Sequence, residues 1–137
     1  MANKKVKWLI YTVLVGLIPI LARMLVWSVS RSPKMELLNT SDLVAFGLVL
    51  HISNINEIEH LNSSEHSWKT IHNGTSIVFI SFYGILFAVS LISSSNPNLI
   101  HQDYLENLCI ALSIVSFLLS FSVYHTVSKI SKDSREN

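Results

Sequence analysis

The sequence is poor in charged residues and contains a single cysteine. Charged residues make up 14% of the 137 positions, whereas a soluble domain carries about 25%. The formal net charge of +1 leaves no basic patch of the kind that binds nucleic acid. The lone Cys109 excludes a disulfide framework and a thiolate metal site.

Catalytic motifs are also missing. The chain contains no GxSxG, Walker A, GxGxxG or HExxH pattern. We therefore expect no enzymatic activity and no cofactor. Histidines and glutamates do gather in one segment: Glu57, Glu59, His60, Glu65, His66 and His72. A di-iron bundle needs two Glu-x-x-His pairs and further carboxylates, and Glu57 to His60 is a single pair, so we expect a solvated, partner-facing surface and no metal site.

The sequence is rich in long apolar runs. Half of the residues are hydrophobic, and the mean hydropathy is +0.43. The first run exceeds the apolar region of a signal peptide, which is about 7–15 residues long, so we expect it to be retained. The pattern predicts an all-α membrane protein with four transmembrane helices, at about residues 8–29, 39–55, 76–93 and 105–127.

The second of these helices is unusual because it continues into polar sequence. Asn39 and Asp42 have the spacing of an N-cap and a first-turn acid. After the apolar block at 43–50, His51 begins a polar stretch with no Pro or Gly to end the helix. We expect His51 to mark the boundary between lipid and water, and the helix to continue as an amphipathic rod to about Leu61.

Residues 53–73, which include the end of this rod, are expected to form a cytoplasmic extension. Apolar residues recur along the rod at Ile52, Ile55, Ile58 and Leu61, with Asn54, Asn56, Glu57 and Glu59 on the opposite face. A further short helical turn is expected through Trp68, with Gly74 as its C-terminal stop. Lys129 and Lys132 recur at helical spacing after the fourth span, so the last helix is expected to project beyond the bilayer.

The distribution of Lys and Arg predicts the orientation. Four spans bring both termini and the 53–73 extension to one side, which carries Lys4, Lys5, Lys7, Lys69, Lys129, Lys132 and Arg135. The other side carries only Arg31 and Lys34. Because basic residues favour the cytoplasmic side, we expect both termini inside and a location in the cell inner membrane.

Arg23 is the charge that lies deepest in the first span. Asp42 lies at a similar depth on the returning helix, so an antiparallel pair of helices would bring the two together. Three interpretations remain open: Arg23 snorkels outward, Arg23 and Asp42 form a structural pair, or the pair serves ion passage.

Small residues recur on one face of each of the last two spans. The positions are Ser81, Gly84 and Ala88 in the third span and Ser113, Ser116 and Ser120 in the fourth. Such residues allow membrane helices to approach closely, and their hydroxyls bond across the contact. Helix packing is one interpretation, and a narrow hydroxyl-lined pore in an oligomer is the other.

The cytoplasmic extension is the expected place of partner binding. Its apolar edge lies beside acidic residues, and apolar residues in a polar rim are typical of an interaction site. The acidic bias argues against a lipid surface, because anionic headgroups would repel it. The residues expected to bind a partner are Ile55, Glu57, Ile58, Glu59, His60, Leu61 and Trp68.

The overall plan of the chain resembles a known family. A small four-span chain with basic termini inside and the extension ISNINEIEHL at residues 52–61 is similar to the membrane subunit of the Kiwa anti-phage defence system. The resemblance implies a bacterial inner-membrane homo-oligomer, taken as a tetramer, that senses phage attack at the envelope. It also implies a soluble cytoplasmic subunit that binds DNA, so that this chain itself makes no direct contact with nucleic acid.

Two functions follow as alternatives. The first is a membrane sensor and scaffold in antiviral defence that docks a soluble cytoplasmic effector through residues 53–73. The second is a small channel or holin-like pore that depolarises the membrane.

Overall fold

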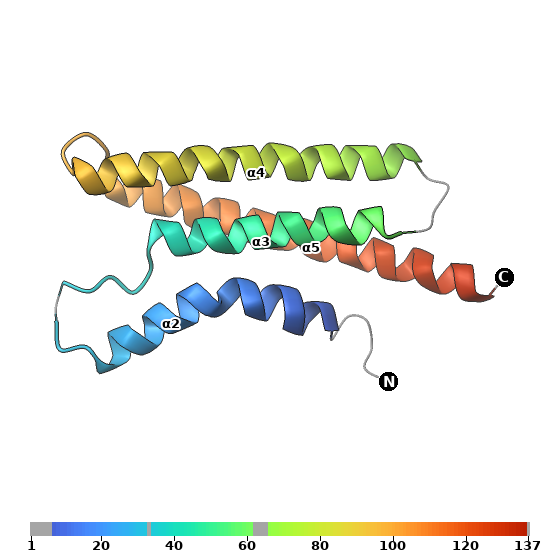
Figure 1. The fold of residues 1–137 in the computed structure, drawn as a ribbon, viewed down its shortest axis with the longest axis horizontal. Coiled ribbons are helices and arrows are strands. Elements are labelled where there is room, and N and C mark those ends of the chain that lie inside the picture. Colours follow the sequence, from blue (N-terminus) through green and yellow to red (C-terminus); the bar gives the residue numbers. More distant parts are fainter. Residues whose placement is uncertain (1–6, 33, 62–65, 137) are drawn as a thin grey trace.

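The computed structural model describes residues 7–32, 34–61 and 66–136. Its elements are η1 at Leu9–Leu14, α2 at Val15–Val29, α3 at Thr40–Glu59, α4 at His66–Ser95 and α5 at Gln102–Glu136. Because η1 leads directly into α2, the chain forms four helical rods (Figure 1), and no strand occurs in the described ranges. The all-α prediction is therefore confirmed.

The first rod is bent (Figure 1). It begins with the six-residue π-helical segment η1, and Pro19 lies inside α2. Proline lacks a backbone donor and its ring clashes with the carbonyl four residues earlier, while a π-turn also disturbs the helical ladder. Both are recognised causes of a bend in a helix.

The second rod begins at the predicted cap. Asn39 has an extended backbone, and its Oδ1 accepts a hydrogen bond of 2.9 Å from the Ser41 amide. Asp42 lies in the first turn, where a negative charge suits the helix dipole. The helix then runs without interruption through His51 and ends at Glu59, close to the predicted end at Leu61.

The third rod corrects the expected helix boundaries. Gly74 was expected to end a short turn before a span at Ser76, but α4 begins at His66 and passes through Gly74. A single glycine costs a helix interior only about 1 kcal/mol, and no proline follows to stop it. The expected basic residues Lys4 and Lys5, and residues 62–65 of the extension, lie outside the described residues.

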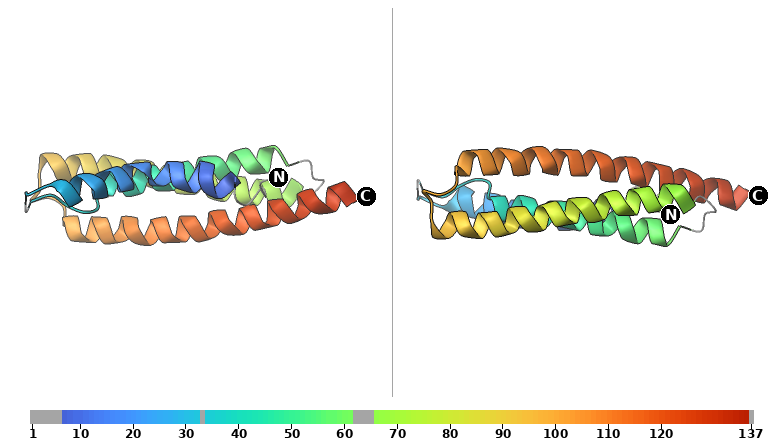
Figure 2. Two further views of the ribbon diagram at one scale, coloured as in Figure 1. Left: turned by 90° about the horizontal axis from the view of Figure 1, so that it is seen from below. Right: turned by 90° about the horizontal axis from the view of Figure 1, so that it is seen from above.

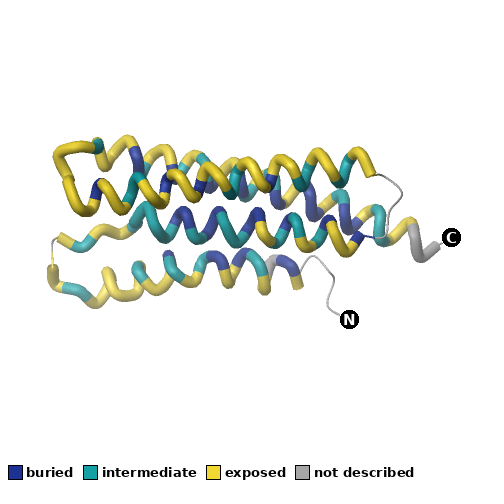
Figure 3. The backbone as a smooth tube through the Cα atoms, turned by 45° about the horizontal axis from the view of Figure 1, so that its top comes forward, coloured by how far each residue is buried: buried dark blue, intermediate teal, exposed yellow. Residues whose placement is uncertain are grey.

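α3 is the central helix of the bundle. It packs against η1, α2, α4 and α5, and α4 also packs against α5. Figures 1 and 2 show α2 on one side of α3, with α4 and α5 on the other. Its inward residues are buried along its whole length (Figure 3).

Both described chain ends lie at one end of the bundle, together with the end of α3 and the start of α4 (Figure 1). We call this the termini end. The segments that join α2 to α3 and α4 to α5 lie at the other end, which we call the loop end.

Three helices are long and apolar enough to cross a membrane: Ile10–Val29, His66–Ser95 and Gln102–Asp133. Large apolar side chains cover their outer faces, among them Leu25, Ile85 and Leu118, each at least 60% exposed. A water-soluble bundle would place polar residues there. These features indicate a membrane protein whose three apolar helices surround a more polar central one.

Candidate functional site

A buried polar network joins three helices at the middle of the bundle. His51 Nε2 on α3 lies 2.9 Å from Ser116 Oγ on α5. The Tyr83 hydroxyl on α4 lies 2.8 Å from the same Ser116 oxygen. One turn further along, the Asn54 side-chain amide donates to Ser120 Oγ over 2.9 Å. These hydrogen bonds pair His51 Nε2, the Tyr83 hydroxyl and the Asn54 amide with serine hydroxyls, whereas His51 Nδ1 has no hydrogen-bond partner among the described residues.

The position of His51 differs from the prediction. It was expected at the boundary between lipid and water, but it is 1% exposed and its ring stacks on Phe79 at a centroid distance of 4.6 Å. Asn54, expected on a solvent-facing side, is 2% exposed, whereas Ile52 is 57% exposed. In a membrane bundle the polar face of a helix turns inward, which reverses the rule for amphipathic helices in water.

Gly47 gives Tyr83 its place in this network. A Cβ atom at position 47 would lie 2.0 Å from Tyr83 Cζ, a distance that atoms cannot adopt. Tyr83 is fully buried, and its ring occupies the space beside Gly47. The absence of a side chain at Gly47 therefore brings α3 and α4 close enough for the Tyr83 hydroxyl to reach α5.

The two rows of small residues have different surroundings. Ser113, Ser116 and Ser120 are buried against α3, and Ser113 Oγ donates to the Leu43 carbonyl over 3.3 Å. This row packs α5 against α3 within one chain, and its hydroxyls form hydrogen bonds there. The α4 row is exposed: Ser81, Gly84 and Ala88 face outward, and a Cβ at Gly84 would meet nothing within 4 Å.

Arg23 and Asp42 form an ion pair in which Arg23 Nε donates to Asp42 Oδ2. Their side chains are 28% and 14% exposed. The same side of the first rod carries Thr12, whose hydroxyl lies 2.9 Å from Ser53 Oγ, and Gly16, which lies against Phe46. The first rod thus presents its polar and small residues to α3.

A second apolar cluster lies at the termini end. Ile58 and Leu61 are buried against Val123 and Val127, with Trp68 and Ile130 packed beside them. It is separate from the main core, which lies around Leu50 and Tyr83. We call residues 55–61, 66–75 and 122–133 the projecting end. They lie beyond the Asn54–Ser120 hydrogen bond, on the side of the chain termini.

The expected partner-binding residues are divided by this cluster. Ile58 is fully buried and Leu61 is 7% exposed, so the predicted apolar edge is internal packing and not a free surface. Ile55, Glu57 and Trp68 are half-buried. Glu59 and His60 are exposed, and Glu59 accepts a hydrogen bond from the Asn73 amide of α4.

Two histidines of the projecting end contact backbone carbonyls one turn earlier in their own helices. The Nδ1 atoms of His60 and His72 lie 2.7 Å and 3.0 Å from the carbonyls of Asn56 and Trp68, one turn earlier. Within the described residues, no three His, Cys, Asp or Glu side chains group around a point that could hold a metal ion.

Sequence reasoning missed the His51–Ser116–Tyr83 network, although a signal for it was present. The residues that α3 buries include Leu43, Gly47, Leu50, Asn54 and Ile58. Their steps of three and four mark one helical face. The prediction rested instead on the isoleucines that recur from Ile52, which mark a different face of the helix.

Comparison with protein-family models, curated proteins and solved structures found no match to this chain.

Proposed function

We propose that this protein is a four-span inner-membrane scaffold that docks a soluble cytoplasmic effector on its projecting end. The observation that carries the proposal is the second apolar cluster. It packs the end of α3 against α5, with Trp68 of α4 beside it. A packed helical platform on a membrane bundle is suited to binding another protein.

The fourth span in this proposal is α3. Its 20 residues give a length of about 30 Å, which matches the hydrocarbon thickness. Its polar side chains bond to η1, α2 and α5 and so avoid lipid. Backbone and side-chain groups satisfied in this way are what the membrane interior requires.

Charge supports a cytoplasmic location for the termini end. Lys69, Lys129 and Lys132 belong to its described residues, whereas Arg31 and Lys34 lie at the loop end. Basic residues favour the cytoplasmic side of a membrane. The effector therefore meets the projecting end from the cytoplasm.

The helix lengths support the platform. α4 has 30 residues and α5 has 35, which correspond to about 45 Å and about 52 Å. Both exceed a hydrocarbon core of about 30 Å. α5 extends past the end of α3 at the termini end (Figure 1), where Glu59, His60 and Ser67 are exposed.

Homo-oligomerisation is part of the proposal. The outward row of Ser81, Gly84 and Ala88 on α4 offers a close contact to a second copy. The Kiwa resemblance implies the setting, namely a bacterial envelope in which the oligomer, taken as a tetramer, responds to phage attack. An assembled ring presents several projecting ends to the effector.

The experiment is site-specific photo-crosslinking in cells of the source organism, with the probe at His60 or at Ser67. Both positions are exposed on the projecting end. The expected result is one adduct of defined mass that contains the same soluble protein at both positions. Purified with the full-length chain, that protein is expected to bind again.

The matched controls are probes at Asn98 on the loop end and at Leu118 on the apolar surface, both exposed. Neither is expected to give the adduct. An equal yield of that adduct at Asn98, or no soluble adduct at His60 and Ser67, would refute docking at the projecting end.

A further inference from the structure

A cavity at the termini end lies where the first rod, α3 and α5 meet. Its volume is about 250 Å³. The residues that line it are Lys7, Trp8, Tyr11 and Thr12 of the first rod, Glu57 of α3, and Tyr124, Val127 and Ser128 of α5. Aromatic, charged and hydroxyl groups from three helices therefore surround one space.

A pair of stacked rings forms one wall of the cavity. The first rod packs against α3 and reaches α5 through Trp8, whose ring stacks on Tyr124 at a centroid distance of 4.9 Å and an interplanar angle of 13°. Both residues are buried. The wall is therefore held in place by the packing of the bundle.

The lining carries one positive and one negative charge. These are Lys7, which is exposed, and Glu57, which is half-buried, and they come from different helices. Neither side chain has an ion-pair or hydrogen-bond partner among the described residues. Charges attract a counter-charge more strongly where the surroundings contain less water. A ligand with one anionic and one cationic group complements both of them.

The cavity lies at the level expected for lipid headgroups. The first span is expected to begin near residue 8 and the fourth to end near residue 127, so the lining residues lie on both sides of the membrane boundary. Tyr11 is 71% exposed, and Trp and Tyr are enriched at membrane–water interfaces. Leu14 and Val15, the next residues of the first rod, are exposed and apolar. They offer a surface for acyl chains beside the cavity.

We infer that this cavity binds the headgroup of a membrane lipid that carries phosphoethanolamine. The lipid phosphate pairs with the Lys7 ammonium, and the primary ammonium of the headgroup donates hydrogen bonds to the Glu57 carboxylate. Ammonium groups are also attracted to aromatic faces, which the cavity supplies.

The two charges of the cavity discriminate between headgroups. Phosphatidylglycerol has no cationic group, so its phosphate is attracted by Lys7 but repelled by Glu57. Phosphatidylcholine has a cationic group without N–H donors, so it forms no hydrogen bond with the carboxylate. Phosphatidylethanolamine satisfies both residues. The inference needs only that the termini end lies at a membrane surface, and it is independent of effector docking.

The test is native mass spectrometry of the full-length protein, purified in detergent and stripped of lipid. It is titrated with phosphatidylethanolamine, phosphatidylcholine and phosphatidylglycerol of identical acyl chains. The expected result is one phosphatidylethanolamine bound per chain, with an affinity about tenfold higher than for the other two lipids, because a hydrogen bond between charged groups is of that strength.

Two substitutions separate the contributions of the two charges. Glu57→Gln is expected to abolish the preference and leave similar affinities for the three lipids. Lys7→Gln is expected to weaken the binding of all three severalfold. Lys7 is exposed, so its substitution is expected to leave the melting temperature of the lipid-free protein unchanged.

The matched controls are Lys132→Gln and Asp133→Asn. Both residues are exposed charges at the same end that do not line the cavity, so both variants are expected to keep the parent's preference. Phosphatidylglycerol binding as tightly as phosphatidylethanolamine, or an unchanged preference in Glu57→Gln, would overturn the inference. Equal affinity for soluble O-phosphoethanolamine would overturn the assignment to a lipid.

Discussion

His51 and Ser116 join the centres of α3 and α5, with the imidazole Nε2 2.9 Å from the serine Oγ. Tyr83 brings α4 to the same oxygen. Three helices therefore meet at one buried serine hydroxyl. Within a membrane an unpaired polar group is costly, and this arrangement explains how polar side chains of α3 are accommodated at the centre of an apolar bundle.

Ser116→Ala tests that meeting point. The substitution removes two hydrogen bonds, and bonds between membrane helices average about 0.6 kcal/mol and reach about 1–2 kcal/mol. We expect a loss of about 1–3 kcal/mol in the free energy of unfolding, measured by denaturant titration in detergent.

A double-mutant cycle with Tyr83→Phe is expected to be non-additive, because both changes remove the same bond. Ser95→Ala is the control, since the exposed Ser95 hydroxyl donates to the Leu91 carbonyl of its own helix. Additive effects of Ser116→Ala and Tyr83→Phe would contradict the network.

Gly47→Ala is expected to destabilise the bundle because the new methyl group would overlap the Tyr83 ring. Overpacking of this kind costs about 1–3 kcal/mol. Gly74→Ala places the same methyl group in open space on α4 and is expected to be neutral or slightly stabilising. Melting temperatures of the two variants in one detergent provide the comparison, and equal values would rule out close packing at Gly47.

The Arg23–Asp42 pair predicts rescue by exchange of charge. Arg23→Asp or Asp42→Arg alone leaves two like charges in partly buried positions, at an expected cost of about 1–3 kcal/mol. The double exchange is expected to recover much of the yield of folded protein, measured by size-exclusion chromatography. If the double variant assembles no better than either single one, the pair has no structural role.

The second apolar cluster predicts that the projecting end loosens when Ile58 is truncated. Ile58→Ala removes a fully buried side chain, and such truncations cost about 2–5 kcal/mol. Amide hydrogen exchange is expected to accelerate in the last turns of α3 and around Val123 and Val127.

Ile52→Ala is the matched control, because Ile52 on the same helix is 57% exposed. It is expected to leave these exchange rates unchanged. Similar protection of the projecting end in both variants would show that the cluster does not hold it together.

The all-α architecture was predictable because apolar runs, capping residues and turns act locally. Asn39 caps α3 from two residues away, and such local interactions can be read from a sequence. The proximity of Arg23 and Asp42 followed from counting residues on either side of a turn.

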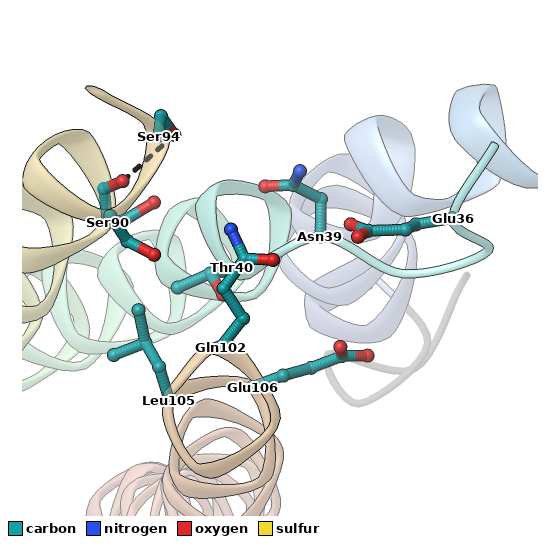
Figure 4. A pocket seen from close by; sticks show the side chains of 9 residues that line it. Glu36, Asn39, Thr40, Ser90, Ser94, Gln102, Leu105 and Glu106 are labelled. Atoms are coloured by element: carbon teal, nitrogen blue, oxygen red, sulfur yellow. Dashed lines mark hydrogen bonds between the residues drawn. The ribbon is translucent and has the colours of Figure 1, made fainter. Parts of the chain in front are cut away.

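The inward face of α3 and the role of Gly74 were not predictable in this way. His51 and Asn54 are polar, so they were assigned to water, but their partners Ser116 and Ser120 lie 65 and 66 residues away. Only the packing of the whole bundle shows that polar groups turn inward here. A pocket at the loop end likewise joins residues 36–40 to residues of the α4–α5 hairpin, which lie far away in the sequence (Figure 4).

The central claim is that α3 crosses the membrane, and single-cysteine labelling tests it most directly. In a Cys109→Ser background, cysteines at Ser32 and Ser67 report on the two ends of α3, since both positions are exposed. A membrane-impermeant maleimide is applied to intact spheroplasts and to inverted vesicles. Four spans predict labelling of position 32 only in spheroplasts and of position 67 only in inverted vesicles. Labelling of both positions from the same side would show that α3 does not cross, and would contradict the account.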